Sequence, residues 1–369
     1  MPEKADVAII GAGVAGLTAA LHLAEDGCSV LVIDQGDAFR GGSGANAGTL
    51  ALQNKKSELI MFYRAALAEW RRLGDAVGGD MGYVGRGGLR VAESEEEAET
   101  LSREVARQKE LGIETEWLDG NRLRHHAPWL GPSIACATYC AGDGFASPLL
   151  VGRALVEAAK RAGVGIATKR AFLGQRATDD GCRLETSAGP IDCGDVVIAA
   201  GPWSGQVGDK LGVTIPVECH VNMLSVTRRM AQFMDNQVVT HIAGRLTLKQ
   251  YPNGSCLLGG GWRGRGGIDT GRKDLHLGRL EQNLRLHGQV APHLRDAAIL
   301  RSWAGFEAET PDHWPIAGGF RDHPRLFAAI PAKAGFTAGA LVGRLTAERI
   351  LSGETPSWAR PMDPDRFQH

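Results

Sequence analysis

The sequence has 369 residues, 43% of them hydrophobic and 22% charged, and its 41 Lys and Arg residues nearly balance its 42 Asp and Glu residues. This composition is typical of a globular chain that buries a sizeable core. Near-neutral charge without a long basic run argues against nucleic acid or an anionic membrane surface as a partner. No apolar stretch reaches the roughly 18 residues that a membrane span needs, so we expect a soluble protein.

Seven cysteines are scattered along the chain without a CxxC pair. Because their number is odd, they cannot all pair within one chain, and we interpret them as free thiols in a reducing compartment. Cys136 and Cys140 lack neighbouring His or Cys residues that would complete a four-ligand metal site. We therefore expect a cytoplasmic protein without a bound metal.

The chain begins with a predicted strand, helix and strand. Residues 5–10 form a short apolar run, residues 14–24 place apolar side chains at helical spacing before Gly27, and residues 29–33 form a second apolar run. Such a unit predicts parallel strands that are covered on both faces.

The turn between the first strand and the helix matches the pattern G-x-G-x-x-G at Gly11, Gly13 and Gly16. These glycines predict a tight turn, a close approach of pyrophosphate to the backbone, and close packing of the helix on the strand. The helix N-terminus would supply N–H groups to the phosphates. Asp34 ends the second strand, where a carboxylate binds an adenosine ribose and disfavours the 2′-phosphate of NADP. The motif predicts dinucleotide binding and leaves NAD and FAD open.

Further helices are predicted at 55–73, at 94–111 behind the capping box Ser94-x-x-Glu97, at 147–163 with Ser147 as the cap, and at 338–351. Short strands are predicted at 165–168, 183–186, 196–200, 299–307 and 326–330. Residues 215–260 form a strand-rich stretch that contains a predicted turn at 251–254. The predicted fold class is α/β, with a Rossmann-type domain (residues 1–80, 145–212 and 300–369) interleaved with an α+β substrate domain on a mostly antiparallel sheet (residues 81–144 and 213–299).

Several segments carry a family resemblance when taken together in their order along the chain. They are Gly-Gly-Ser-Gly-Ala-Asn-Ala-Gly-Thr at 41–49, Asp-Gly-Phe-Ala-Ser-Pro at 143–148, Val-Val-Ile-Ala-Ala-Gly-Pro-Trp at 196–203, Trp-Ala-Gly at 303–305, Thr-Pro-Asp at 310–312 and Gly-Phe-Thr at 335–337. With them the chain resembles, over essentially its full length, the D-amino-acid oxidase-like family of FAD-dependent oxidoreductases. It is most similar to catalytic subunits of the opine oxidase, hydrogen cyanide synthase and bacterial proline or hydroxyproline dehydrogenase type.

The resemblance implies FAD as the cofactor. The glycine motif and the resemblance together assign to the FAD site Gly11, Gly13, Val14, Ala15, Gly16, Asp34, Gln35, Gly42, Ser43, Asn46, Ala47, Gly48, Thr49, Ala171, Phe172, Ala200, Gly201, Trp203, Gly305, Gly335, Phe336 and Thr337. In this placement residues 335–337 offer the start of a helix to the flavin O2 side, where negative charge develops on reduction. The segment 41–48 has no His and the segment 303–318 has no Cys, so we expect non-covalent FAD.

The implied reaction is oxidation of the C–N bond of an opine, a D-amino acid or an N-substituted amino acid, with hydride transfer to flavin N5 and hydrolysis of the resulting imine. O2 or a partner subunit in a hetero-oligomer would accept the electrons. Many relatives place an Arg two residues after Trp-Ala-Gly, whereas this chain has Glu307. A carboxylate there would repel a substrate carboxylate and attract an ammonium or guanidinium group, which favours opine-type substrates. Lys333, Lys249 and Trp262 are the other candidates for orienting the substrate, and no acid/base pair is assigned.

Two alternatives remain at this point. One is a non-catalytic or electron-relay FAD subunit of a heteromeric dehydrogenase, and the other is the flavoprotein domain of an RNA-modifying enzyme. Near-zero net charge and only 6% aromatic residues argue against the second alternative.

Overall fold

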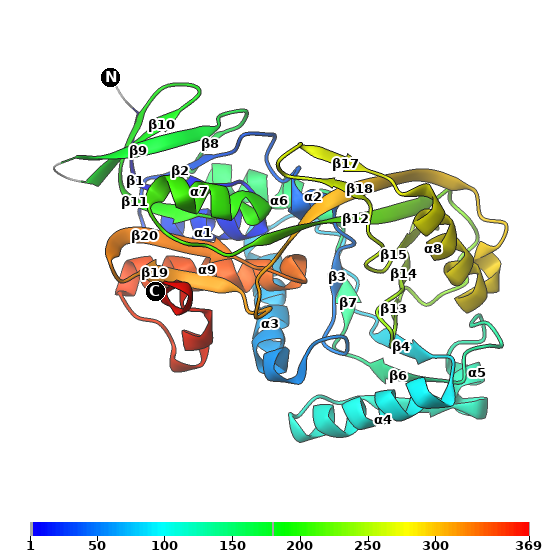
Figure 1. Ribbon diagram of the computed structural model, residues 1–369. Coiled ribbons are helices and arrows are strands. Elements are labelled where there is room, and N and C mark those ends of the chain that lie inside the picture. Colours follow the sequence, from blue (N-terminus) through cyan, green and yellow to red (C-terminus); the bar gives the residue numbers. More distant parts are fainter. Residues whose placement is uncertain (1–2, 179–180, 369) are drawn as a thin grey trace.

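The computed structural model describes residues 3–178 and 181–368. Within them two eight-stranded sheets form the two halves of a mixed α/β fold, as the sequence predicts, and the elements between the sheets come from distant parts of the chain (Figure 1). No helix in the described part of the chain is long and apolar enough to cross a membrane.

The first sheet contains the predicted parallel strands. It consists of β1 (Glu3–Ile10), β2 (Val30–Ile33), β8 (Gly165–Ala167), β9 (Phe172–Thr178), β10 (Gly181–Thr186), β11 (Ile191–Ile198), β19 (Ile316–Phe320) and β20 (His323–Ile330). The strand order is β19-β20-β11-β1-β2-β8, with β10 paired to β11 and β9 paired to β10. The four central pairs from β20 to β8 are parallel, and β19, β10 and β9 pair antiparallel.

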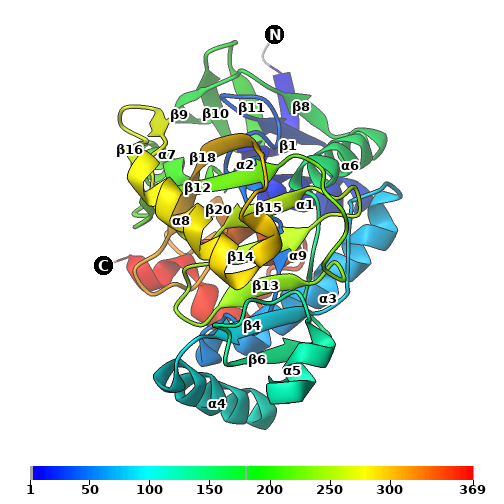
Figure 2. The ribbon, with the colours of Figure 1, turned by 90° about the vertical axis from the view of Figure 1, so that its right-hand side faces the viewer.

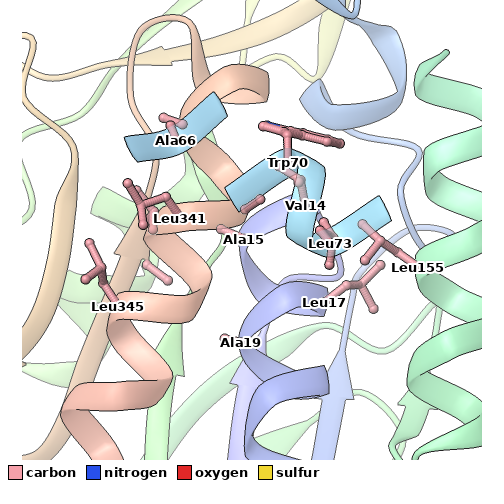
Figure 3. Close-up of a cluster of buried hydrophobic side chains, with 14 of the residues drawn as sticks. Val14, Ala15, Leu17, Ala19, Ala66, Trp70, Leu73, Leu155, Leu341 and Leu345 are labelled. Carbon is pink, nitrogen blue, oxygen red and sulfur yellow. The ribbon is translucent and has the colours of Figure 1, made fainter. Parts of the chain in front are cut away.

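Helices cover one face of the central parallel strands, and the antiparallel strands β9 and β10 pack with α7 on the other face. The helices are α1 (Val14–Glu25), α3 (Ile60–Val77), α6 (Pro148–Arg161), α7 (Ser204–Leu211) and α9 (Gly335–Ser352). Along β1, Val7 and Ile9 pack in a core with α1, α3, α6 and α9, while Ala8 and Ile10 face the core that includes β9, β10 and Leu211 of α7. Figure 3 shows Val14 and Leu17 of α1 among side chains from α3, α6 and α9. The alternation along β1 confirms the prediction of a sheet that is buried on both faces.

The second sheet is built around the strand-rich stretch. It consists of β4 (Gly88–Ala92), β5 (Glu116–Asp119), β6 (Cys136–Cys140), β12 (Glu218–Thr227), β13 (Val238–His241), β14 (Thr247–Gln250), β15 (Cys256–Gly259) and β18 (Ile299–Glu309), in the order β18-β12-β15-β14-β13-β4-β6-β5. Only the pair β13–β4 is parallel among its described pairs. Figure 2 shows this sheet with α8 (Leu277–Val290) near β14 and β15, and with α4 (Glu95–Glu110) and α5 (Gly120–His126) at the end that carries β4 and β6.

Short elements complete the fold. A strand pair, β3 (Thr49–Leu50) with β7 (Gly144–Phe145), lies between the two sheets, and α2 (Gly42–Ala45) precedes β3 (Figure 1). A second ribbon, β16 (Arg265–Gly267) with β17 (Arg272–Asp274), follows β15 in the chain. All seven cysteines are free thiols.

Of three expectations about helix starts, one was confirmed in full, one was confirmed in position only, and one was wrong. The Ser94 hydroxyl caps α4 by accepting from Glu97 N at 3.2 Å, as predicted. Ser147 is the N-cap residue of α6 and Pro148, which has no N–H, occupies the first helical position, both as expected, but the Ser147 side chain makes no capping bond. The helix predicted from residue 55 begins only at Ile60, because residues 57–59 form a 3₁₀ turn and Lys55 lies in the preceding loop.

The strand pairing also bears on the domain division. We retain the two interleaved domains as a proposal, since the segments that build each sheet follow the predicted order. However, β18 pairs along its length with β12 of the second sheet, although the boundary at residue 300 placed it in the cofactor domain. By its pairing this strand belongs with the substrate domain.

Candidate active site

A cavity of about 920 Å³ lies where the two sheets meet. Its walls include Ile10, Ile33, Ala199 and Pro331, which stand at or just beyond the carboxyl ends of β1, β2, β11 and β20. Ligands of open parallel sheets bind outside these strand ends. The opposite wall comes from β12, β13, β14 and β18 of the second sheet, so that both halves of the fold contribute to one site.

The glycine turn has the tight geometry that its motif predicts. Gly11 has a φ of +120°, and a Cβ there would lie 2.3 Å from the carbonyl oxygen of Ala199. A Cβ at Gly16 would lie 2.0 Å from the oxygen of Gly11, so α1 packs directly on the turn. Gly11, Gly13, Val14 and Ala15 line the cavity, whereas Gly16 lies behind the lining. The first N–H groups of α1 therefore border a cavity that can receive the phosphates of a dinucleotide.

Asp34 lines the cavity beside this turn, together with Gln35. Its Oδ2 accepts from Ala12 N at 2.9 Å and its Oδ1 accepts from Gly36 N at 2.8 Å. The carboxylate thus fixes the glycine turn as well as facing the cavity. Each carboxylate oxygen can accept more than one hydrogen bond, which leaves capacity for a ribose hydroxyl.

The segment 42–49 forms the next wall, and Gly42, Ser43, Asn46, Ala47, Gly48 and Thr49 all line the cavity. The Ser43 hydroxyl accepts from Val14 N at 3.0 Å, which joins this segment to the start of α1. The side chain of Asn46 donates to the carbonyl oxygen of Ser43 and accepts from Gly48 N at 2.5 Å. These bonds hold an irregular segment in one shape along the length of the cavity.

The start of α9 also borders the cavity, which Gly335, Phe336 and Thr337 line. The Thr337 hydroxyl donates to Thr49 O at 2.9 Å, and Trp70 of α3 donates to Thr337 O at 2.9 Å. Ala334, which caps α9, has a φ of +56°, a left-handed conformation that L residues rarely adopt. The turn presents the N-terminal end of α9 to the cavity, as the sequence predicts.

Glu307 also lines the cavity, from β18. Its carboxylate accepts a hydrogen bond from the Asn222 amide of β12, and Arg263 donates to the other side of that amide at 3.1 Å. Asn222 was not identified from the sequence. A chain of hydrogen bonds therefore holds the Glu307 carboxylate on the cavity wall.

Lys333 lies at the cavity, but its ammonium already has a partner. Its Nζ donates to Glu309 Oε1 at 3.0 Å, and His313 and His220 also approach the Glu309 carboxylate, at 2.8 and 3.2 Å. Burial would raise the pKa of Glu309, but the hydrogen bond from Lys333 and the nearby charges hold it below its usual value. Lys333 is thus largely neutralised before any substrate binds.

Lys55 and Tyr63 line the cavity and were not singled out from the sequence. The Lys55 ammonium lies 4.7 Å from the centre of the Tyr63 ring, and Tyr63 donates to Lys333 O at 2.8 Å. Burial lowers the pKa of Lys55 to about 8, and it raises the pKa of Tyr63, which the charge of Glu307 raises further. In the sequence, Lys55 follows closely after the segment 41–49, which could have marked it as a cavity residue. It was instead assigned to the predicted helix at 55–73 because it fits the helical spacing.

Besides Gly16, three candidates do not line the cavity. Lys249 is fully buried in β14, where its Nζ donates to Ala47 O at 2.6 Å and to Thr49 Oγ1 at 2.8 Å, so it supports the segment 42–49 from behind. Burial lowers its pKa well below the usual value. Trp262 donates to Arg245 O at 2.7 Å and packs against the hydrophobic clusters of the second sheet. Ala171 bonds to Ser187 through both its N–H and its carbonyl oxygen, which leaves the cavity wall to Phe172.

The remaining candidates for the FAD site lie together as predicted. Ala200, Gly201, Trp203 and Gly305 all line the cavity. Trp203 packs edge-on against Phe306, with ring centres 5.5 Å apart. The described residues therefore bring most of the predicted cofactor set to one continuous wall. The geometry fits a Rossmann-type protein that binds a dinucleotide in a cavity whose opposite wall is a second sheet.

Comparison with known proteins agrees with this class. Residues 6–349 match the family model described as DAO, FAD dependent oxidoreductase. The chain is 28% identical to glycine oxidase of Geobacillus kaustophilus, over 96% of this chain and 95% of the relative, and 25% identical to a subunit of the opine oxidase of Rhizobium meliloti, over 95% and 94%. The crystal structure of the Geobacillus kaustophilus glycine oxidase superposes with a TM-score of 0.89 at 25% identity, covering 100% of this chain and 99% of that one.

The chain belongs to the DAO family of FAD-dependent oxidoreductases. It is an FAD-dependent enzyme that oxidises the C–N bond of amino acids or amines. The glycine turn, the carboxylate of Asp34 and the two helix N-termini fit the phosphates, the ribose and the flavin end of this cofactor.

Proposed function

We propose that the enzyme oxidises a secondary amine that carries carboxylates, as opines do. The observation that supports this substrate is Glu307, which hydrogen bonds hold on the cavity wall. A carboxylate at this position disfavours a simple amino acid bound by its own carboxylate and favours a substrate with a positively charged group. The relationship to an opine oxidase supports the same class of substrate.

FAD supplies the hydride acceptor at N5, and the chain's own groups bind and orient the two reactants. The helix start at 335–337 would stabilise negative charge at the flavin O2 side, because helix N-termini carry partial positive charge. Glu307 would accept a hydrogen bond from the substrate nitrogen. An amine that binds in its neutral form needs no dedicated base, so we assign none.

We further propose that FAD is held non-covalently and that O2 or a partner subunit removes its electrons. The segment 41–48 has no His and the segment 303–318 has no Cys, which supports a non-covalent cofactor. The similarity to one subunit of an opine oxidase supports a partner. The alternative of a non-catalytic or electron-relay subunit predicts that no amine reduces the flavin.

An anaerobic flavin-reduction screen tests this function. The panel contains opines, D-amino acids, N-methyl amino acids and prolines, and the readout is bleaching of the flavin absorbance, with and without any copurifying partner. We expect opine-type secondary amines to give the largest rate of reduction divided by apparent Kd. If no member of the panel bleaches the flavin, catalysis of amine oxidation by this chain is contradicted.

Glu307→Arg tests the proposed origin of the preference. We expect the ratio of kcat/KM for N-methyl amino acids over opines to rise about tenfold or more, since a charge-assisted hydrogen bond to a carboxylate contributes roughly 1.5–3 kcal/mol. Glu114→Arg makes the same change at an exposed position outside the cavity and should leave the ratio unchanged. Equal ratios in wild type and Glu307→Arg would exclude the role given to Glu307.

A further inference from the structure

Lys55 is a half-buried cavity residue whose ammonium has no bonded partner among the described residues, whereas Arg40, Lys56, Lys210 and Lys273 of the cavity lining are exposed. It lies in the loop between β3 and the 3₁₀ turn at 57–59, and its side chain is half-buried because one side faces the cavity. Among residues 3–178 and 181–368, no hydrogen bond or ion pair involves its ammonium. The ammonium lies over the Tyr63 ring, 4.7 Å from the ring centre.

The neighbouring charges do not neutralise Lys55. Asp143 is buried, and its carboxylate accepts from Leu52 N at 2.7 Å and from Gln53 Nε2 at 3.1 Å. Glu307 is held by Asn222, and Arg90 and Lys333 are paired with Glu104 and Glu309. Asp143 and Glu307 favour the charged form of Lys55 from a distance, but neither carboxylate bonds to its ammonium. An enclosed ammonium without a bonded anion is unfavourable, so this end of the cavity is electrostatically suited to an anionic ligand.

The position of Lys55 also fits the chemistry of the site. Tyr63, on which its ammonium rests, donates to Lys333 O in the turn that leads into α9. Lys55 therefore stands on the same wall as the helix start assigned to the flavin. A carboxylate bound by Lys55 would place the adjacent carbon toward that end of the cavity.

We propose that the Lys55 ammonium binds one carboxylate of the substrate, while Glu307 faces the substrate nitrogen. This assignment rests on the proposed function and specifies its substrate as an amine with at least one carboxylate close to the oxidised carbon. Lys55 and Glu307 form the cationic and anionic ends of the pocket. Lys333, which Glu309 neutralises, is not needed for this binding.

A non-oxidisable probe tests the proposal without turnover. Diglycolate is the ether analogue of a secondary amine with two carboxylates, and methoxyacetate carries one carboxylate. Their Kd values are measured on the FAD-loaded full chain from perturbation of the flavin absorbance. We expect Lys55→Met to weaken diglycolate about tenfold or more and Lys55→Arg to stay within about threefold of wild type, because a guanidinium also binds a carboxylate.

The control is Lys160→Met, an identical change at an exposed position of α6 outside the cavity, which should leave both Kd values unchanged. FAD content and the midpoint of thermal unfolding show whether each variant is folded. Lys55→Arg preserves the charge, so its rescue of binding separates loss of the ammonium from loss of structure.

The pH dependence supplies a second readout. With a pKa of about 8, Lys55 is charged below pH 8 and neutral above it, so the affinity for diglycolate should fall up to tenfold per pH unit above 8. The titratable groups around Lys55 are Asp143, Tyr63, Arg90, Glu307 and Lys333. Burial raises the pKa of Asp143 to about 6, raises the pKa of Tyr63 and lowers the pKa of Arg90. In Lys55→Arg the affinity for diglycolate should no longer fall above pH 8. Lys55→Met should bind diglycolate weakly at every pH, with no fall above pH 8.

Unchanged diglycolate binding in Lys55→Met would overturn the inference. So would a change in the flavin reduction potential with no change in probe binding, because Lys55 would then serve the cofactor. Probe binding that depends on Lys55 in a protein that no amine reduces would contradict the proposed function and support the inference. Amine-driven reduction with an unchanged KM in Lys55→Met would support the function and overturn the inference.

Discussion

At the scale of single residues, the glycine turn shows how little space the fold leaves around the cofactor. Gly16 lies behind the cavity wall, yet a Cβ there would be 2.0 Å from the oxygen of Gly11. The missing side chain at Gly16 therefore lets α1 approach the turn, and we expect phosphate contacts at the residues before it. The motif predicted this close packing because it depends on the absence of a side chain at a fixed spacing.

Gly16→Ala should weaken FAD binding without touching the cofactor. The added methyl must push α1 away from the turn, and overpacking of this kind costs about 1–3 kcal/mol. Gly174→Ala is the matched control, since a Cβ at Gly174 meets no atom within 4 Å. The checks are the FAD Kd from fluorescence titration and the thermal midpoint. Equal FAD affinity in both variants would show that the close packing at Gly16 is dispensable.

Asp143 predicts an unusual pH dependence of stability. Burial raises its pKa to about 6, against an ordinary value of 3.8 in the unfolded chain. Between these values the folded state holds a proton that the unfolded state has released, so this group makes the protein less stable as pH rises through that window, by on the order of 3 kcal/mol. Asp143→Asn should remove this contribution. Urea unfolding at pH 4.5 and 6.5 measures it, and an equal pH response in wild type and variant would contradict it.

At the scale of elements, α3 positions the start of α9. Trp70 of α3 is buried, donates to Thr337 O at 2.9 Å, and its ring centre lies 4.7 Å from that of Phe336. Thr337 is bonded in turn to Thr49. A helix that does not line the cavity along most of its length thus fixes two of the segments that do.

Trp70→Phe keeps an aromatic ring but removes the donor to Thr337. We expect the free energy of unfolding to fall by about 1–2 kcal/mol and FAD to bind more weakly. The variant loses a buried hydrogen bond, and the smaller Phe ring leaves a cavity that the surrounding side chains fill only in part. Trp358→Phe, at a side chain that is 46% exposed, should change neither quantity. Thermal unfolding and FAD titration of both variants provide the test, and an equal response would exclude the bracing role of Trp70.

The elements that sequence patterns predicted are those with a regular period. The first strand, α1, the second strand and α4 have clear apolar spacing or a cap, and they form close to the expected residues. Residues 55–59 share the helical period of α3 but remain outside it, since hydrogen bonding at a helix start depends on tertiary contacts as much as on spacing. The strands β4, β5 and β6 are four or five residues long and carry too few positions for alternation to be visible.

At the scale of the whole molecule, most residues assigned to FAD from the sequence line the cavity, whereas several residues on the rest of its lining were not predicted. The residues assigned to FAD lie on short segments where the backbone must come close to a ligand or to another segment. That requirement restricts the residue types at neighbouring positions, so a short sequence pattern is enough to identify them. Lys55, Tyr63 and Asn222 line one cavity although they come from a loop, from α3 and from β12. Lys249 was predicted to contact the substrate, but its ammonium donates to Ala47 O and Thr49 Oγ1 instead. The alternation of residues along a strand does not predict this contact with a distant segment. Such contacts depend on how distant segments are placed in three dimensions.

Because the cavity takes walls from both sheets, FAD should stabilise the whole molecule and not one half. Binding to the folded state alone contributes about 4 kcal/mol at a free FAD concentration of about 1,000 times Kd, and the contribution keeps rising with the logarithm of concentration. Calorimetry of apoprotein with increasing FAD should therefore shift every unfolding transition upward. Riboflavin, which lacks the phosphates and adenosine that the turn at 11–16 is built to hold, should shift them far less. A transition that stays fixed while another rises would show that one sheet unfolds independently of the cofactor, and would contradict a site shared by both.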